Sequence, residues 1–329
     1  MKTDWSTLWL FPTMSDCRYR PRAASDLRLL PVPEEDYPAL IDLYKRLHDL
    51  PDQARIPAGG HTWCRSQRTM TVDGPCYVLA LLPQARTLSE LGVPAVTQKA
   101  LLAEDLRGLV LIAGKQGAGK TTLAGAVVQE RVRLYGGSAR VIEDPPEMEI
   151  HEVMEHGLIQ QIDAASAPAD IPSRERLAWF ARSSVRSRAD LLFLGEVRDA
   201  SEASAVVLQS GIGGPVITTI HADSVDTAID RLIALAARDM GTEGAASHVA
   251  AHLSLVLHLT LSSRRIESHP RPALAGQGRE DGLMVLSVRA LSIAPDDRAL
   301  RSAVRRHDSA TIRQATESQS ANHLYRTAF

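Results

Sequence analysis

One eight-residue segment, Gly114 to Thr121, most narrows what this chain can fold into. It reads GKQGAGKT and satisfies the pattern GxxxxGK[ST] in full. The apolar run Leu109 to Ala113 precedes it as a predicted strand, and residues 120–135 follow as a predicted helix. Glycines let the backbone N–H groups turn toward an anion, and the helix N-terminus adds a partial positive charge. The sequence therefore predicts a phosphate-binding loop between a buried strand and a helix.

Two side chains of this loop have chemistry that suits a nucleoside triphosphate. We expect Lys120 to contact the β- and γ-phosphates and the hydroxyl of Thr121 to bind Mg²⁺. The chain contains no guanine-reading NKxD sequence, so ATP is the expected nucleotide. The residues expected to bind it are Gly114, Gln116, Gly117, Ala118, Gly119, Lys120, Thr121 and Thr122.

Apolar runs and helical patterns alternate from about Gly108 onward. Strands are predicted at 109–113, 139–143, 191–194 and 216–220, with helices near 120–135, 174–187 and 224–237. This alternation predicts α/β class, with a mostly parallel sheet covered by helices on both faces. A stretch that passes from helix to strand is expected over 249–261, and a further strand over 284–293.

Acidic residues follow two of the predicted strands. Glu143 ends one of them, and Glu196 comes directly after Leu191 to Gly195. Because the carboxyl ends of parallel strands meet at one edge of a sheet, both acids are expected beside the phosphate loop. A carboxylate there can activate the attacking water. Glu196 is the first candidate for that base, Glu143 the second and Glu147 the third, and a solvent-facing acid after a strand is the alternative.

The usual second acid that holds Mg²⁺ at a strand end is missing, because Gly195 takes its place. Magnesium would then rely on Thr121, phosphate oxygens and water. Asp190 precedes the same strand, roughly 20 Å from Glu196 at about 3.3 Å per residue. We therefore expect Asp190 at the wrong end of the sheet for a ligand.

Histidines give one further candidate. His221 ends the predicted strand 216–220, where its side chain could sense the γ-phosphate through a hydrogen bond. A structural role is the alternative. His248 and His252 stand four residues apart, which suits a metal on a helix, but no third ligand is apparent and we expect them to be structural.

The N-terminal part of the chain has a different pattern. Residues 37–50 have helical spacing, and strand-like runs at 62–72 and 77–82 flank the turn Asp73 to Pro75. We divide the chain into an N-terminal α+β domain with a loose leader at 1–25, a linker, an α/β domain and a polar tail, with boundaries 1–83, 84–104, 105–304 and 305–329.

Composition excludes several classes of protein. A net charge of -2 argues against non-specific coating of nucleic acid, which needs clustered positive charge. Cys17, Cys64 and Cys76 are too few for a disulfide scaffold or a four-cysteine zinc site, and they suit a reducing cytoplasm. The patch Leu8 to Phe11 is too short for a signal peptide, and no run approaches the length that spans a bilayer.

Taken together, four segments in order resemble the boxes of the secretion and pilus motor ATPases, also called traffic ATPases. GKQGAGKT is similar to their Walker A loop, VIEDPPE to the aspartate box, VRSRADLLFLGEVRDASEA to Walker B and GGPVITTIHADSVDTAIDRL to the histidine box. In Walker B, Ala189 replaces the usual proline and Phe193 an aliphatic residue. The resemblance covers about residues 65 to 290, and its matching Walker B residues are Arg186, Asp190, Gly195, Glu196, Arg198 and Asp199.

This resemblance implies a RecA-like P-loop NTPase domain, a small PAS-like N-terminal domain and a homohexameric ring with ATP between the two domains. It also implies arginine fingers from the N-terminal domain, for which Arg65 and Arg68 are the candidates. Ala80 stands where the family has a second arginine, which departs from the usual arrangement. Arg198, beside Glu196 in the matched box, is expected to contribute to catalysis.

The function implied is ATP hydrolysis that drives a type IV secretion, conjugation or type IV pilus machine. The expected cofactors are ATP and Mg²⁺, and the expected partners are further copies of the chain and inner-membrane platform or channel proteins, without direct nucleic-acid binding. The protein would be cytoplasmic and peripheral to the inner membrane. The missing zinc-cysteine module and retraction motif favour type IV secretion or conjugation. The alternatives are a RecA-like nucleic-acid motor and a nucleotide-binding regulator that does not hydrolyse ATP.

Overall fold

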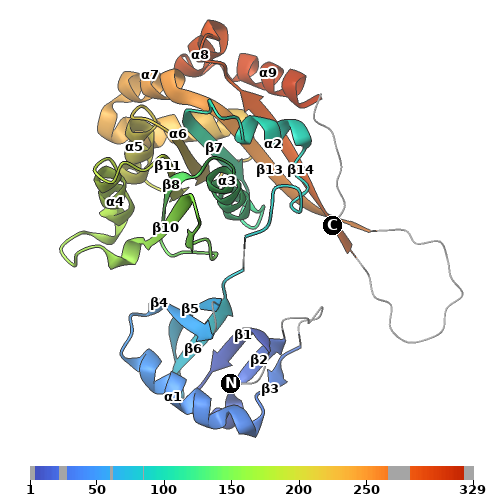
Figure 1. The fold of residues 1–329 in the computed structure, drawn as a ribbon, viewed down its shortest axis with the longest axis vertical. Coiled ribbons are helices and arrows are strands. Elements are labelled where there is room, and N and C mark those ends of the chain that lie inside the picture. The colour runs from blue at the N-terminus through green and yellow to red at the C-terminus, as the bar shows by residue number, and fades with distance from the viewer. Residues whose placement is uncertain (1–3, 22–27, 60–61, 84, 266–281, 322–329) are drawn as a thin grey trace, which may run out of the picture. The chain divides into compact units, whose positions relative to one another are not determined.

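The computed structural model describes residues 4–21, 28–59, 62–83, 85–265 and 282–321 (Figure 1). The chain forms two compact units, Met1–Gln84 with Pro145–Glu149, and Ala85–Asp144 with Ile150–Phe329. Each unit has its own cluster of buried apolar side chains. None of the helices in the described part of the chain is long and apolar enough to cross a membrane.

The smaller unit is a six-stranded antiparallel sheet with one long helix. The strand order is β3-β2-β1-β6-β5-β4. Its elements are β1 (Trp5–Leu10), η1 (Met14–Asp16), β2 (Arg18–Pro21), β3 (Leu30–Pro31), η2 (Glu34–Asp36), α1 (Tyr37–His48), β4 (Gln53–Gly59), β5 (Thr62–Thr71) and β6 (Gly74–Leu81). Leu40 and Leu47 of α1 join Leu8 and Leu79 of the sheet in one buried cluster. The helix, the hairpin and the α+β class therefore agree with the sequence pattern.

The prediction of a loose leader over residues 1–25 is wrong where the structure describes it. β1 is a central strand that pairs with both β2 and β6. The pairing of β1 with β2 shifts register between Trp5 and Thr7, so the apolar residues do not alternate simply along the strand. Its main partner, β6, comes more than sixty residues later in the chain. Local spacing could not reveal this pairing.

The larger unit is built on an eight-stranded sheet with the order β14-β13-β7-β12-β11-β8-β10-β9. The strands are β7 (Gly108–Gly114), β8 (Gly137–Glu143), β9 (Glu152–Val153), β10 (Gly157–Asp163), β11 (Leu191–Val197), β12 (Pro215–Ile220), β13 (Leu253–Arg265) and β14 (Gly282–Ser292). Among the described residues, the six strands β13, β7, β12, β11, β8 and β10 run parallel, and the outer strands β14 and β9 pair antiparallel with their neighbours. The predicted parallel α/β sheet is confirmed.

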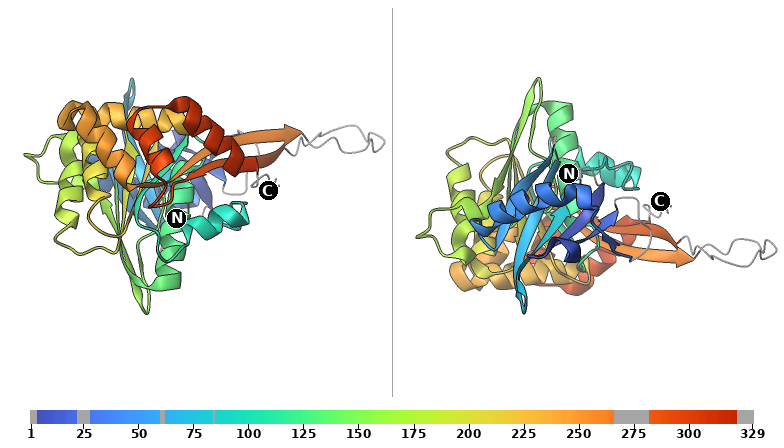
Figure 2. Two further views of the ribbon diagram at one scale, coloured as in Figure 1. Left: turned by 90° about the horizontal axis from the view of Figure 1, so that it is seen from above. Right: turned by 90° about the horizontal axis from the view of Figure 1, so that it is seen from below.

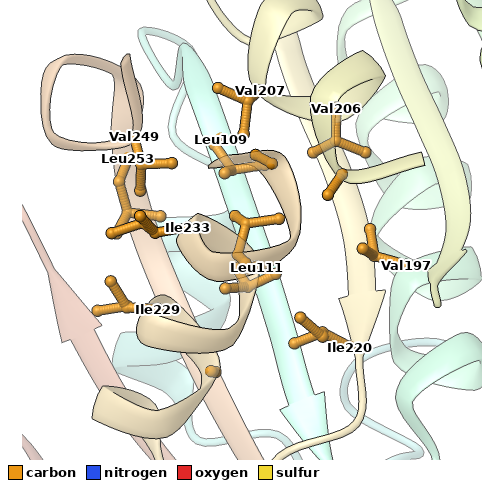
Figure 3. Close-up of a cluster of buried hydrophobic side chains, with 14 of the residues drawn as sticks. Leu109, Leu111, Val197, Val206, Val207, Ile220, Ile229, Ile233, Val249 and Leu253 are labelled. Atoms are coloured by element: carbon orange, nitrogen blue, oxygen red, sulfur yellow. The ribbon is translucent and has the colours of Figure 1, made fainter. Parts of the chain in front are cut away.

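Helices cover both faces of this sheet. They are α2 (Ala95–Leu101), α3 (Lys120–Tyr135), α4 (Arg176–Ser184), α5 (Ala200–Gln209), α6 (Val225–Met240), α7 (Thr242–His252), α8 (Arg298–Arg305) and α9 (Ser309–Ala321), with the short turns η3 (Ala164–Ser166) and η4 (Ser173–Glu175). Leu109 and Leu111 of β7 pack against α6 and α7 in one core cluster, seen in Figure 3. Right-handed crossovers that run in opposite directions along the sheet place α3 on the other face.

One strand of the larger unit is missing from the sequence prediction. Strand β10 was not predicted, and it joins β8 in parallel register from Gly157 to Asp163. In the polar tail, α9 buries Ile312 in the core, whereas residues 322–329 lie outside the described residues. The strand β13 pairs with β7 only as far as Leu259, and beyond it continues alongside β14 as a projecting hairpin (Figure 2).

Candidate nucleotide site

Glycines shape the turn between β7 and α3. Gly114, Gly117 and Gly119 have φ angles of 153°, 76° and 86°, in the region that side chains disfavour. A Cβ on Gly114 would lie 2.7 Å from the carbonyl oxygen of Leu259, whereas a Cβ on Gly117 or Gly119 would meet no atom within 4 Å. The first glycine is therefore required by close packing, and the other two border open space. The turn has the form of a cradle for an anion.

Lys120 is the first residue of α3, and only 7% of its surface is exposed. Its Nζ donates to the carbonyl oxygens of Gly114 and Lys115, each at 3.1 Å. The same Nζ lies 3.7 Å from Oε1 of Glu196. The buried ammonium of Lys120 is thus held inside the turn and faces the carboxylate of Glu196, which lies near the end of β11.

Glu196 reaches this position because β11 carries a bulge. In the pairing with β12, Leu194 is opposite Thr218 and Glu196 is opposite Thr219, so Gly195 is one residue extra. Its carbonyl oxygen accepts from Oγ1 of Thr218 at 2.9 Å. A bulge re-aims the side chain that follows it. Leu194 therefore stays in the core, and Glu196 points toward Lys120.

Arg198 lies beside Glu196 on the loop that leads into α5. Its Nε donates to Oε2 of Glu196 at 3.2 Å, and its Nη1 donates to the carbonyl oxygen of Asp144 at 3.4 Å. Glu196 is thus flanked by two cations, one buried and one exposed. Each of the two carboxylate oxygens of Glu196 therefore has a cation beside it.

Glu143 ends β8, the strand beside β11, and is buried with 3% of its surface exposed. Its Oε2 accepts from Nε2 of Gln161 on β10 at 2.8 Å. A Cβ on Gly195 would lie 3.5 Å from the Cα of Glu143, so the two strand ends are in close contact. The third acid, Glu147, is exposed and belongs to the smaller unit.

His221 follows β12, whose last residue Ile220 pairs with Ala113 of β7. It is exposed, at the same edge of the sheet as the glycine turn. The phosphate loop and the ends of β12, β11 and β8 are therefore neighbours, as the parallel topology requires. The structure brings Lys120, Glu196, Glu143 and His221 to one edge.

A second histidine at this edge was missed by the sequence reasoning. His258, on β13 opposite Ala113, donates a hydrogen bond to the carbonyl group of Ala222. Burial lowers the pKa of His258, so it is neutral at pH 7. Nearby, Lys115 and Asp223 form an exposed ion pair at 3.7 Å. An isolated histidine inside an apolar strand gave no sequence signal for this contact.

Thr121 and Thr122 stand in the first turn of α3, and both are half-buried. The N-cap, Gly119, supplies no side-chain acceptor to the N–H groups of that turn. These donors, the ammonium of Lys120 and the Thr121 hydroxyl form the donor set that a phosphate with its Mg²⁺ requires. Among the described residues no group of three His, Cys, Asp or Glu could hold a metal ion by itself.

The two candidate arginine fingers lie on opposite faces of β5 in the smaller unit. Arg68 shares its face with the buried Cys64 and Ser66, and its Nε donates to Oδ1 of Asp52 at 2.7 Å. That bond raises the pKa of Arg68. Arg65 lies on the other face, directly opposite Ala80 on β6. Arg68 is therefore held by an ion pair within its own unit, whereas no residue in the described part of the chain forms an ion pair with Arg65.

The opposite edge of the parallel sheet carries a cleft of about 780 Å³ that shares no residue with the glycine turn. Asp190 lines it, and its Oδ2 accepts from the backbone N–H of Ser138 at 2.8 Å. Asp190 thus sits away from the phosphate loop. His248 and His252 lie with ring centroids 6.0 Å apart on α7.

Comparisons with known proteins cover most of the chain. The family model described as type II/IV secretion system protein matches residues 49–322. The competence protein ComGA of Streptococcus pneumoniae is 36% identical over 129 residues, 39% of this chain and 37% of its own length. The pilus assembly ATPase PilB of Acinetobacter baylyi is 25% identical over 295 residues, 81% of this chain and 46% of its own length. The chain spans about a third to a half of these relatives.

Solved structures share the fold. The pilus retraction motor PilT with bound ADP has a TM-score of 0.69 at 18% identity, covering 94% of this chain and 84% of its own. The ATPase DotB of Legionella pneumophila has a TM-score of 0.68 at 18% identity, covering 95% and 84%. Because the family model matches far more than half of the residues, the chain belongs to the type II/IV secretion system protein family, whose members include secretion and pilus ATPases.

Proposed function

We propose that this chain is the ATP-hydrolysing subunit of a hexameric motor that drives a type IV pilus, type IV secretion or conjugation machine. One observation carries the proposal: the ammonium of Lys120, held in the glycine turn, faces the carboxylate of Glu196 at 3.7 Å. A phosphate-binding cation and a carboxylate that can act as a base thus meet in the region into which the γ-phosphate of ATP would enter.

In the proposed reaction, Glu196 accepts a proton from the water that attacks the γ-phosphorus of ATP. The bond to the β–γ bridging oxygen breaks, which yields ADP and inorganic phosphate. Lys120 stabilises the charge that develops on the phosphate oxygens, and Arg198 keeps Glu196 oriented. Mg²⁺, held through Thr121, would neutralise the β- and γ-phosphates. His221 would sense the γ-phosphate, with Glu143 as the second acid.

Arg65 is the better of the two arginine-finger candidates. Its face of β5 is not the one on which Arg68 binds Asp52. We propose that Arg65 reaches the ATP of a neighbouring subunit, where a cation stabilises the transferred phosphoryl group. A closed ring built from one repeated heterologous interface provides such a neighbour.

The proposed partners are further copies of the chain and inner-membrane platform or channel proteins of the machine. The proposed location is the cytoplasm, at the inner membrane through those partners. Several relatives are named for such machines, among them a twitching motility protein of Neisseria gonorrhoeae, 27% identical over 203 residues, which is 60% of this chain and 50% of its own length.

The test is steady-state ATPase activity of the purified protein against protein concentration, beside the Glu196→Gln variant. A motor ring predicts activity that rises more steeply than linearly with concentration and is lost in the variant, which still binds ATP. If the assembled protein binds ATP but does not hydrolyse it, the result would favour a regulator that does not hydrolyse ATP. Activity stimulated only by single-stranded DNA would favour a nucleic-acid motor.

A further inference from the structure

Glu202 is a buried acid just outside the site, in the first turn of α5, with 9% of its surface exposed. Its Oε2 accepts from the backbone N–H of Arg198 at 2.6 Å and from that of Asp199 at 3.3 Å. In return, Oδ1 of Asp199 accepts from the N–H of Glu202 at 3.0 Å. These bonds form a capping box, and the contact with Arg198 extends it one residue further along the loop.

The bond to Arg198 fixes the backbone from which this arginine reaches the proposed base. The Arg198 side chain is 57% exposed, and its Nε lies 3.2 Å from Oε2 of Glu196. Packing alone does not hold an exposed side chain in one direction, so the geometry of the loop beneath it matters. Glu202 is therefore connected to Glu196 through a single residue.

We propose that Glu202 is a positioning residue whose negative charge holds Arg198 against Glu196, so that protonation of Glu202 slows ATP turnover. This inference rests on the function proposed above and describes the regulation of the same site. Glu202 contacts no reacting atom in this scheme. Its effect passes through the backbone of Arg198.

The charge on Glu202 changes in the neutral range. Burial raises the pKa of Glu202 to about 7; Asp199 raises it further, and the N–H bonds and the Arg198 charge lower it. On segments packed against α5, Glu175 pairs with Arg174, Asp226 pairs with Arg313, and Asp239 accepts from Ser204. Among the described residues, the buried Nε of Arg176 on α4 has no hydrogen-bond partner. A carboxylate holds N–H groups more strongly than a neutral carbonyl does. Loss of the charge near neutral pH therefore loosens the loop.

The experiment measures kcat and KM for ATP between pH 5.5 and pH 8.5 for the full chain and two variants. Glu202→Gln keeps an acceptor without the charge, and Glu202→Ala removes both. At pH 8.5 we expect kcat of Glu202→Gln to be about five-fold below wild type, with the difference vanishing at pH 5.5, because the amide mimics the protonated acid. Glu202→Ala should be slower than Glu202→Gln at every pH, with KM little changed in both variants.

Two controls separate the possible failures. Glu243→Gln changes an exposed acid in the first turn of α7 and should follow the wild-type pH profile. Circular dichroism checks that each variant is folded. A constant ratio of wild type to Glu202→Gln across the pH range overturns the positioning role, as does a Glu202→Ala variant with wild-type kcat. Wild-type turnover by Glu196→Gln would instead overturn the proposed function on which this inference rests.

Discussion

The ammonium of Lys120 lies 3.7 Å from the carboxylate of Glu196, although Lys120 begins α3 and Glu196 lies near the end of β11, more than seventy residues later in the chain. Both side chains are at least partly enclosed, with 8% and 30% of their surfaces exposed. The two opposite charges form an ion pair between the glycine turn and the end of β11. It also occupies the region into which a γ-phosphate would enter.

Replacement of Lys120 should therefore lower the rate of ATP hydrolysis. In Lys120→Ala we expect kcat/KM for ATP to fall by at least about a hundred-fold, because the variant lacks a donor to the transferred phosphate. The measurement is phosphate release at several ATP concentrations. Lys99→Ala, an exposed lysine of α2, serves as the matched control and should retain activity. Equal activity of the two variants would contradict the role of Lys120.

The bulge at Gly195 gives a second prediction. A Cβ there would lie 3.3 Å from the carbonyl oxygen of Ile142, which is a tight contact between two strands. In Gly195→Ala we expect kcat to fall several-fold and the unfolding free energy to drop by about 1 kcal/mol. Gly213→Ala is the control, because its Cβ would meet nothing within 4 Å. The measurements are kcat and the unfolding free energy in denaturant for both variants. Equal values for Gly195→Ala and Gly213→Ala would show that the bulge tolerates a side chain.

Stability should depend on pH through Glu202. Burial raises its pKa to about 7, so between the unfolded value and pH 7 the folded state binds a proton that the unfolded state releases. The contribution of Glu202 is therefore most favourable at acid pH and is lost as pH rises through the folded pKa. Relative to Glu202→Gln, wild type should lose about 3 kcal/mol of unfolding free energy between pH 4.5 and pH 8. Urea unfolding of both proteins at several pH values measures this change. A wild type whose unfolding free energy stays constant or rises with pH relative to that of Glu202→Gln would refute the assignment.

The two arginines of β5 should behave differently. Arg65→Ala is expected to lower kcat by about a thousand-fold in the assembled protein, as the loss of an arginine finger does, with ATP binding unchanged. Arg68→Ala removes the partner of Asp52 and should affect the melting of the smaller unit more than turnover. Activity and thermal melting of both variants distinguish these roles. The reverse order of effects on kcat would make Arg68 the finger.

His258 offers a test of the edge beside the glycine turn. His258→Phe keeps a ring but removes the donor to the Ala222 carbonyl group. We expect kcat to fall about five-fold through the loss of one hydrogen bond that holds the loop after β12. Hydrogen exchange of the peptide around residues 219–224 should speed up in parallel. His248→Phe, on the exposed part of α7, should leave both measurements unchanged; a similar effect there would mean that the response is not specific.

Sequence reasoning recovered the parallel sheet because its strands are continuous apolar runs. The run before Gly114 is buried at every position, which is the pattern of a central parallel strand. Topology then placed Glu143, Glu196 and His221 at the edge beside Lys120, because strand ends of a parallel sheet converge. The phosphate-loop motif and the parallel topology together were sufficient to predict where these residues lie.

The remaining contacts depend on pairings between segments that are distant in sequence. The pairing of β1 with β6 in the smaller unit requires a partner far along the chain, and the bulge at Gly195 is visible only from the register with β12. Glu202 resembles any acid in a first helical turn until its burial is known. Single-sequence patterns report period and composition, but they do not report register or desolvation.

The extra residue at Gly195 has one more consequence. Side chains along a strand alternate between the two faces of the sheet, so residues two positions apart share a face. In a regular strand, Leu194 and Glu196 would therefore point to the same face. Because Gly195 is an extra residue, the alternation shifts by one position for the rest of β11. Val197 therefore faces the core that Leu194 occupies, and Glu196 faces the other side of the sheet. The bulge in the backbone, and not the side-chain rotamer of Glu196, therefore sets the face to which the carboxylate points. Without the bulge, Gly195 would pair with Thr219, and the carboxylate of Glu196 would turn to the core face that Leu194 occupies.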